Sequence, residues 1–186
     1  MINLSRFNQK YEEFTDTPDA INFKDVIKEA EKSVKDVQES AGTWDTLNIN
    51  DNLFVMLKKM FSGKEDSVSI PPTGNTWHTH PKSCNSNNDC SIIPPSAQDL
   101  KLFASRPRDQ HMVITENRVY WVKSNEEYTS DQCEEIYNFY IVLENFFDES
   151  DVSHNVYDKL FKYASEYGNF FTIYVFEYND DMLNYM

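Results

Sequence analysis

The stretch that decides the fold is Thr-Trp-His-Thr-His-Pro at 76–81, followed after a polar loop by Pro-Pro-Ser-Ala-Gln-Asp-Leu at 94–100. His78 and His80 are separated by one residue, so on an extended strand both side chains leave the same face. The proline after them ends the strand, because it has no N–H to donate to a neighbouring strand. Asp99 follows at the expected first turn of a helix. Two histidines and one carboxylate are the protein ligands of many catalytic zinc sites, which leave a fourth position to water.

The two halves of this stretch, His-Thr-His-Pro at 78–81 and Ser-Ala-Gln-Asp at 96–99, resemble the signature of the JAMM (MPN-plus, Mov34-like) zinc metalloproteases. That signature is His-(Ser/Thr)-His-Pro, a loop, and then Ser-x-x-Asp. The resemblance covers about residues 66–123 well and the rest of the chain poorly. It implies an α/β fold of the JAMM/MPN-like (cytidine-deaminase-like) type: a mixed β-sheet flanked by helices, with extra C-terminal helices and a closing strand.

Carried over position by position, the resemblance implies that His78, His80 and Asp99 hold Zn²⁺. It also implies that Ser96 stabilises the oxyanion of a tetrahedral intermediate. The expected activity is then hydrolysis of an isopeptide or peptide bond in a protein substrate, with ubiquitin or a ubiquitin-like tail as a candidate.

A water molecule activated by a metal ion needs a nearby proton acceptor. In the family this general base is a glutamate on an early strand, in a Gly-rich context, and no segment of that kind stands out upstream of His78. Four acids are candidates, and they are Glu39 late in a predicted helix, Asp45 on a predicted short strand, Glu65 near a turn and Glu177 on the closing strand. Glu177 shares its strand face with apolar residues, where burial would raise its pKa, unless it lies at the end of the strand in water.

Two other functions stay open. Family members that lack the base serve as scaffolds, so the chain is alternatively a non-catalytic structural or assembly subunit, for example of a viral particle or a multiprotein complex. The lengthened loop after Pro81, with Cys84 and Cys90, favours this alternative. A cysteine hydrolase that uses one of these thiols with His80 lacks a third residue to orient the histidine.

The two loop cysteines have three interpretations: free thiols, a small disulfide in an oxidising compartment, or two ligands of a second metal ion. We expect Cys133, at a helix start, to be packed or half-exposed. We expect His111, His154 and the aromatic run 136–147 to be structural.

The chain has 186 residues, which indicates one domain with a sizeable core, here 1–186. Its net charge of −14 argues against nucleic acid and anionic membranes and suits a basic protein partner. We expect no membrane span and no cleavable signal peptide, because no apolar run is long enough. Three cysteines, an odd count, indicate a reducing compartment. The expected location is the cytoplasm or, alternatively, a virion. Only 4 glycines and many asparagines are typical of AT-rich genomes, including those of large DNA viruses.

Periodicity and turn residues predict the remaining elements. After an N-terminal arm at 1–20, helices are expected at 22–40, capped by Asn22 and ended by Gly42, and at 51–61, 96–105, 129–147 and 154–167. Strands are expected at 43–49, 67–70, 75–80, 111–115, 118–123 and 170–178. The motif-bearing core is then 66–123, and 129–186 supplies the C-terminal helices and the closing strand.

Overall fold

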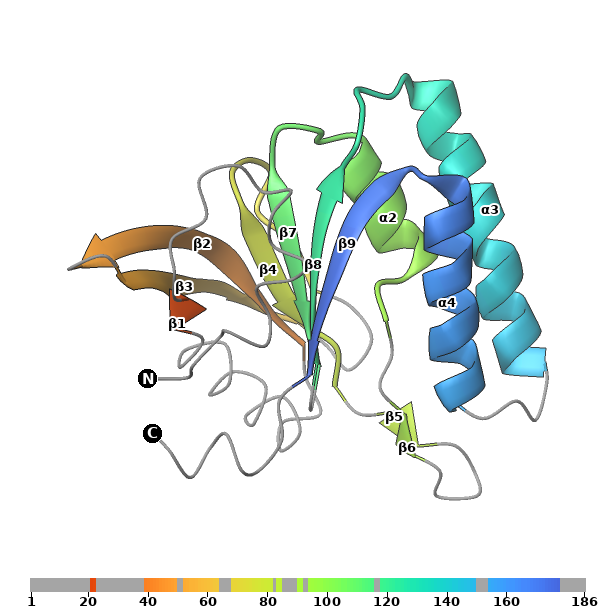
Figure 1. Ribbon diagram of the computed structural model, residues 1–186, viewed down its shortest axis with the longest axis horizontal. Helices are drawn as coiled ribbons and strands as arrows, with labels where there is room; N and C mark the ends of the chain where they lie inside the picture. Colours follow the sequence, from red (N-terminus) through yellow and green to blue (C-terminus); the bar gives the residue numbers. More distant parts are fainter. Residues whose placement is uncertain are drawn as a thin grey trace.

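The protein is an α/β structure in which a mixed seven-stranded sheet has helices packed on one face (Figure 1). The computed structural model describes residues 21–22, 39–49, 52–63, 68–81, 83–84, 90–91, 94–115, 118–149 and 154–177. The sheet strands are β1 (Ile21–Asn22), β2 (Ser40–Ile49), β3 (Asn52–Ser62), β4 (Thr76–Thr79), β7 (Gln110–Ile114), β8 (Arg118–Ser124) and β9 (Phe171–Glu177). The described helices are α2 (Ala97–Ala104), α3 (Ser130–Glu149) and α4 (His154–Gly168).

The strand order is β1-β3-β2-β4-β7-β8-β9. The strands β2/β3, β2/β4, β7/β8 and β8/β9 are antiparallel, whereas β4 and β7 are parallel. The connection from β4 to β7 contains α2, as parallel neighbours require a crossover. The motif strand β4 therefore lies at the centre of the sheet, with the motif helix α2 packed nearby.

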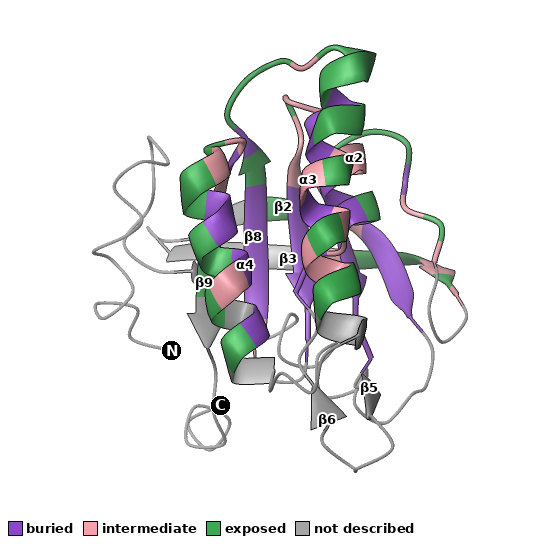
Figure 2. Cartoon of the chain, turned by 90° about the vertical axis from the view of Figure 1, so that its right-hand side faces the viewer, coloured by how far each residue is buried: buried purple, intermediate pink, exposed green. Residues whose placement is uncertain are grey.

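The main core lies between the helices and one face of β7, β8 and β9 (Figures 1 and 2). Its fully buried members combine apolar residues of α2 with alternate residues of the strands, because side chains on a strand alternate between faces. The buried cluster consists of Ala97, Leu100, Phe103, Ala104, Val113, Tyr120, Val122, Cys133, Ile136, Tyr140, Phe161, Ala164 and Phe171. The aromatic run of α3 contributes to this core through Tyr140, while Val142 and Phe146 stay exposed.

The predicted helix at 51–61 is wrong: Asn52–Ser62 is the strand β3, which pairs with β2 from Ser40↔Ser62 to Ile49↔Asn52. A continuous apolar run fits a helix and a buried strand equally well, so the element that pairs with it decides which of the two forms. Only two residues separate β2 from β3, which is the length of a tight hairpin loop. That spacing was the available signal for a strand pair.

Two further predictions at the N-terminal side need correction. Asn22, expected to cap a helix, belongs to β1, and Gly42, expected to end it, lies inside β2 at a register shift between Ala41 and Gly42. Residues 68–70, expected to be a strand, are irregular. The arm at 1–20 and residues 23–38 of the predicted helix lie outside the described residues.

The structure confirms the elements predicted from the motif strand onwards within a residue or two at each end. These elements are β4, α2, β7, β8, α3, α4 and β9. A capping box starts α3, with Gln132 N–H donating to Thr129 Oγ1 (3.3 Å) and Thr129 N–H donating to Gln132 Oε1 (2.9 Å). After α4, the left-handed residue is Asn169 (φ 50°) rather than Gly168.

The two loop cysteines face each other in the backbone register of a second, two-stranded sheet. β5 (Ser83–Cys84) pairs antiparallel with β6 (Cys90–Ser91), and Cys84 stands directly opposite Cys90. Cys133, by contrast, is a free cysteine buried in α3.

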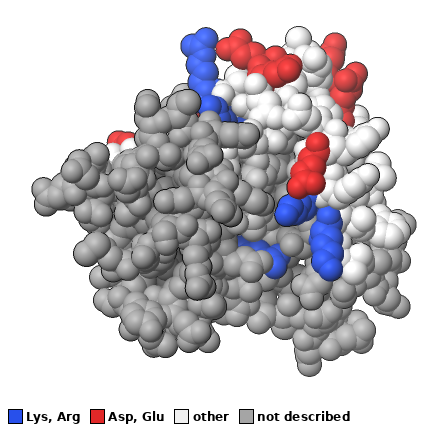
Figure 3. All heavy atoms as spheres, viewed as in Figure 1, with Lys and Arg blue, Asp and Glu red and all other residues white. Residues whose placement is uncertain are grey.

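Within the described part of the chain, no helix is both long and apolar enough to cross a membrane. On the face in Figure 3, the acidic and basic side chains that are described lie interspersed, and the acidic ones gather mainly towards the top of the view.

Candidate metal centre

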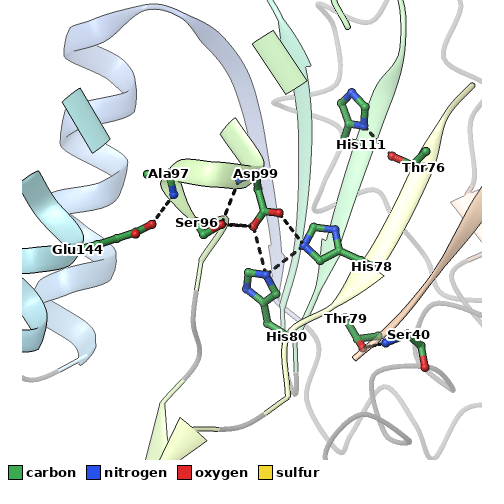
Figure 4. Close-up of polar contacts among 10 residues, drawn as sticks. All are labelled: Ser40, Thr76, His78, Thr79, His80, Ser96, Ala97, Asp99, His111 and Glu144. Atoms are coloured by element: carbon green, nitrogen blue, oxygen red, sulfur yellow. Dashed lines mark hydrogen bonds and ion pairs between the residues drawn. The ribbon is translucent and has the colours of Figure 1, made fainter. Parts of the chain in front are cut away.

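The strand β4 brings two imidazoles together, as the His-x-His spacing predicts. His78 and His80 are both buried, at 2% and 8% exposure, and their Nε2 atoms lie 3.0 Å apart. Their ring centroids are 4.8 Å apart with the planes inclined at 61°. Both rings leave the sheet on the face that α2 covers (Figure 4).

The helix α2 supplies the carboxylate from its first turn. Ser96 is the N-cap and Asp99 the third helical residue, and the two form a reciprocal capping box. Asp99 N–H donates to Ser96 Oγ (3.1 Å), while Ser96 N–H donates to Asp99 Oδ2 (2.9 Å). A Cα–Cβ bond tilted towards the helix N-terminus directs the Asp99 carboxylate back at the end of β4.

The three predicted ligands therefore meet. Asp99 Oδ1 lies 3.3 Å from His78 Nε2, and Asp99 Oδ2 lies 3.2 Å from His80 Nε2. Ligand atoms held about 2.0–2.1 Å from a tetrahedral zinc centre are about 3.3 Å apart, which is close to all three separations. His78, His80 and Asp99 form a group that could hold a metal ion, and the donor set of two nitrogens and one oxygen fits zinc.

The electrostatics of the group keep the carboxyl ionised. Burial by itself would raise the pKa of Asp99, but the charge of His78 and hydrogen bonds from both imidazoles outweigh it and hold that pKa well below its usual value. An ionised carboxylate is the form that binds a metal ion.

The neighbouring strand β7 places a third histidine beside β4, on the face that α2 covers. His111 on β7 is buried, contacts Thr76 Oγ1 through Nδ1 (2.7 Å) and stacks on Phe103 of α2 with centroids 4.1 Å apart. Burial, the charge of Arg106 and the charge of His78 lower the pKa of His111 to about 3. His111 is therefore a neutral packing residue. His78 Nδ1 is buried with no hydrogen-bond partner among the described atoms.

Ser96 belongs to the site through Asp99. Its Oγ–H donates to Asp99 Oδ2 (2.7 Å) and the same oxygen accepts from Asp99 N–H. The hydroxyl hydrogen is thus directed at the carboxylate, and it would have to turn away from Asp99 to reach an oxyanion.

Among the three predicted acids that the structure describes, Glu39 lies nearest to the site along the sheet. The register between β2 and β4 pairs Ala41 with His78. Glu39 comes directly before β2 and His80 directly after β4, so both lie at the strand ends next to this pair. Residues directly opposite on antiparallel strands share a face, with Cβ atoms about 4.5–5.5 Å apart. Ser40 N–H donates to Thr79 Oγ1 (2.9 Å), which fixes the strand end, and Glu39 is buried at 8% exposure.

Two of the other acids lie away from the site. Asp45 is exposed and lies four residues further along β2 than Ala41. At 3.3 Å per residue this is about 13 Å along the strand from Ala41. Glu177 ends β9 opposite Arg118, and two strands separate β9 from β4, which is about 14 Å of sheet. Glu65 lies outside the described residues.

Sequence reasoning missed two residues next to the ligands. Ala41 is fully buried opposite His78, where a small side chain leaves room for the imidazole. Glu144 of α3 accepts a hydrogen bond from Ala97 N–H at the start of α2 (Figure 4). Neither contact has a local signal, because each joins segments that are at least 37 residues apart in the chain.

No protein-family model matches the sequence, and a search of curated proteins gives no match either. The geometry of the site and the arrangement of the elements around it therefore carry the functional argument.

Proposed function

We propose that the protein is a zinc-dependent metalloprotease of JAMM type that hydrolyses an isopeptide or peptide bond, with ubiquitin or a ubiquitin-like protein as the candidate substrate. The observation that carries the proposal is the convergence of three ligand residues, whose nearest ligand atoms lie 3.0–3.3 Å apart, and a buried glutamate directly before the adjacent strand. A hydrolytic metal site requires both parts: ligands that leave a coordination position open and a proton acceptor next to it.

In this proposal His78 Nε2, His80 Nε2 and one oxygen of Asp99 hold the metal ion. When bound, a zinc ion supplies Lewis acidity, which makes water a better nucleophile at neutral pH and polarises a carbonyl group. The hydrogen bonds that Asp99 Oδ2 accepts from Ser96 orient the carboxylate, so that Oδ1 is the oxygen with fewer competing contacts.

Glu39 acts as the general base. Its carboxylate accepts a proton from the attacking water and returns it to the leaving amine, so the proton count closes over one turnover. The position supports this role, because Glu39 is buried directly before β2, two residues from the pair Ala41↔His78, and its backbone is held by Gly63 N–H donating to Glu39 C=O (2.8 Å). Ser96 donates to the oxyanion once its hydroxyl hydrogen turns away from Asp99.

The test uses zinc-loaded protein, di-ubiquitins of different linkage and ubiquitin-like fusion proteins, with turnover measured with and without a chelator. We expect chelator-sensitive cleavage and expect Glu39→Gln to lower kcat by about 10²–10⁴-fold while zinc affinity changes little. Asp45→Asn is the matched control, because it removes an acid from the same strand on exposed surface.

Cleavage by Glu39→Gln at the wild-type rate would refute the role of Glu39. Absence of turnover on all substrates with zinc fully bound would reject the hydrolase. In that case the protein would be an assembly subunit with a metal site, and an assembly that survives His78→Ala would support this second function.

A further inference from the structure

The carboxylate ligand stands on a helix that is too short to be stable alone. α2 has eight residues, whereas isolated helices below about 12–15 residues are marginal in water. Asp99 lies in its first turn, where N–H groups have no partner inside the helix. The position of the ligand therefore depends on what satisfies these groups.

Each N–H group with an observed partner at the start of α2 is bound by a side chain. Ser96 N–H donates to Asp99 Oδ2, and Asp99 N–H donates to Ser96 Oγ, so these two bonds are made within the cap. Ala97 N–H donates to Glu144 Oε1, which comes from α3, 47 residues away. Glu144 is thus the external contact that fixes the first turn of α2.

The contact is of a strong kind. A carboxylate that accepts from a backbone N–H makes a charge-assisted hydrogen bond, and a negative charge at a helix N-terminus interacts favourably with the helix dipole. Glu144 is half-buried, so water screens the bond less than it would on open surface. Figure 4 shows Glu144 reaching from α3 to Ala97, on the side of Asp99 away from His78.

The same pair of helices offers an internal control. Lys101 of α2 forms an ion pair with Glu134 of α3, and Lys101 Nζ lies 5.3 Å from the centroid of the Tyr137 ring. Glu134 is ten residues from Glu144, about 15 Å along α3. Two glutamates of one helix therefore bind the same short helix, but only Glu144 binds the turn that carries Asp99.

We propose that Glu144 is a positioning residue of the metal site: by binding Ala97 N–H it holds the first turn of α2 so that the Asp99 carboxylate stays within reach of both imidazoles. The proposal rests on the metal-binding part of the proposed function and is independent of whether the site hydrolyses a substrate. Glu144 itself is not a ligand in this proposal.

The experiment compares Glu144→Ala, Glu144→Gln and Glu144→Asp with Glu134→Ala. Zinc affinity is measured by competition with a chromophoric chelator, and amide hydrogen exchange at 97–100 is measured on the metal-free protein. We expect Glu144→Ala to weaken zinc binding by roughly 10–100-fold, as loss of a supporting contact around metal ligands does, and to speed exchange in this turn. Glu134→Ala should leave both readouts near their wild-type values.

The conservative variants separate position from charge. Glu144→Gln keeps an oxygen that accepts from Ala97 N–H, so it should recover most of the affinity and of the protection from exchange. Glu144→Asp keeps the charge but is one methylene shorter, so it should behave as Glu144→Ala does. If the alanine variant does not fold, the comparison of glutamine with aspartate decides.

Three outcomes are distinguishable. If the wild-type protein binds no zinc, the metal premise and this proposal both fall. If it binds zinc without cleaving any substrate, the proposed hydrolase is wrong, and the Glu144 variants still decide whether Glu144 is a positioning residue. If Glu144→Ala and Glu134→Ala give the same zinc affinity and the same exchange, Glu144 has no positioning role.

Discussion

Replacing Gly42 by alanine tests the register that brings β2 beside the metal ligands. A Cβ atom at this position would lie 1.8 Å from the backbone oxygen of Lys58 and 2.8 Å from Trp77 Nε1. Real Cβ atoms essentially never come closer than 3.0 Å to another heavy atom, and the first neighbour is backbone rather than the end of a flexible side chain. Strand β3 would therefore have to move away from β2.

The cost follows from the contacts this movement breaks. Gly42 pairs with Lys59, and its neighbour Thr43 pairs with Lys58, so about two ladder hydrogen bonds are at stake, each worth about 1 kcal/mol. Overpacking adds about 1–3 kcal/mol, which gives a loss of about 3–5 kcal/mol in the free energy of unfolding. For a chain of this size that is a fall of about 6–20 °C in Tm.

Gly74→Ala is the matched control in a thermal unfolding assay of the metal-free protein. Gly74 has φ 83°, but nothing lies within 4 Å of an added Cβ. Its replacement costs only the strain of a left-handed residue, about 1–2 kcal/mol. A Gly42→Ala variant as stable as Gly74→Ala would refute the close approach of β3 to β2.

Two further measurements address the site and its support. Burial and the charges of Arg106 and His78 lower the pKa of His111 from 6.5 to about 3. As the pH falls from 6.5 towards 3, the unfolded chain therefore protonates this imidazole while the folded chain does not, and the folded state loses stability. His111→Leu should be less stable than the wild type at pH 7.5, and this difference should shrink by about 2 kcal/mol at pH 5 in urea unfolding of the metal-free protein; an unchanged difference would contradict a neutral His111. Zinc at about 100 times its Kd should raise the free energy of unfolding of the wild type by about 2.7 kcal/mol and that of His78→Ala by much less. An equal increase in the two proteins would show that the ion binds at another site.

The metal ligands could be predicted from the sequence because the rules that place them are local. His-x-His on a strand fixes one face, a proline ends the strand, and Ser-x-x-Asp places a carboxylate in a first helical turn. The residues around them depend on long-range pairing instead. Glu39 was assigned to the end of a helix, and only the pairing of Ala41 with His78 brings it to the site.

The helix predicted at 51–61 failed for a related reason. Its apolar run carries no clear period, and its state is decided by β2, which precedes it by two residues. With that run predicted as a helix, β2 lacks the neighbour β3 but keeps the neighbour β4. The predicted helix 22–40 is what conceals the position of Glu39, because the structure places this residue directly before β2.

The energetics of the site bear on the choice between an enzyme and an assembly subunit. Two imidazoles and a carboxylate, all nearly buried, add little net stability compared with apolar side chains of similar volume, because desolvation offsets their attraction. A subunit that only needs to fold and bind neighbours would gain nothing from this cluster, and a metal ion would account for it. A second carboxylate at Glu39, buried directly before β2, is not needed to hold the ion, since three protein ligands suffice. In the proposed hydrolase Glu39 is the proton acceptor, which is why the variant Glu39→Gln, rather than any change to the ligands, separates metal binding from hydrolysis.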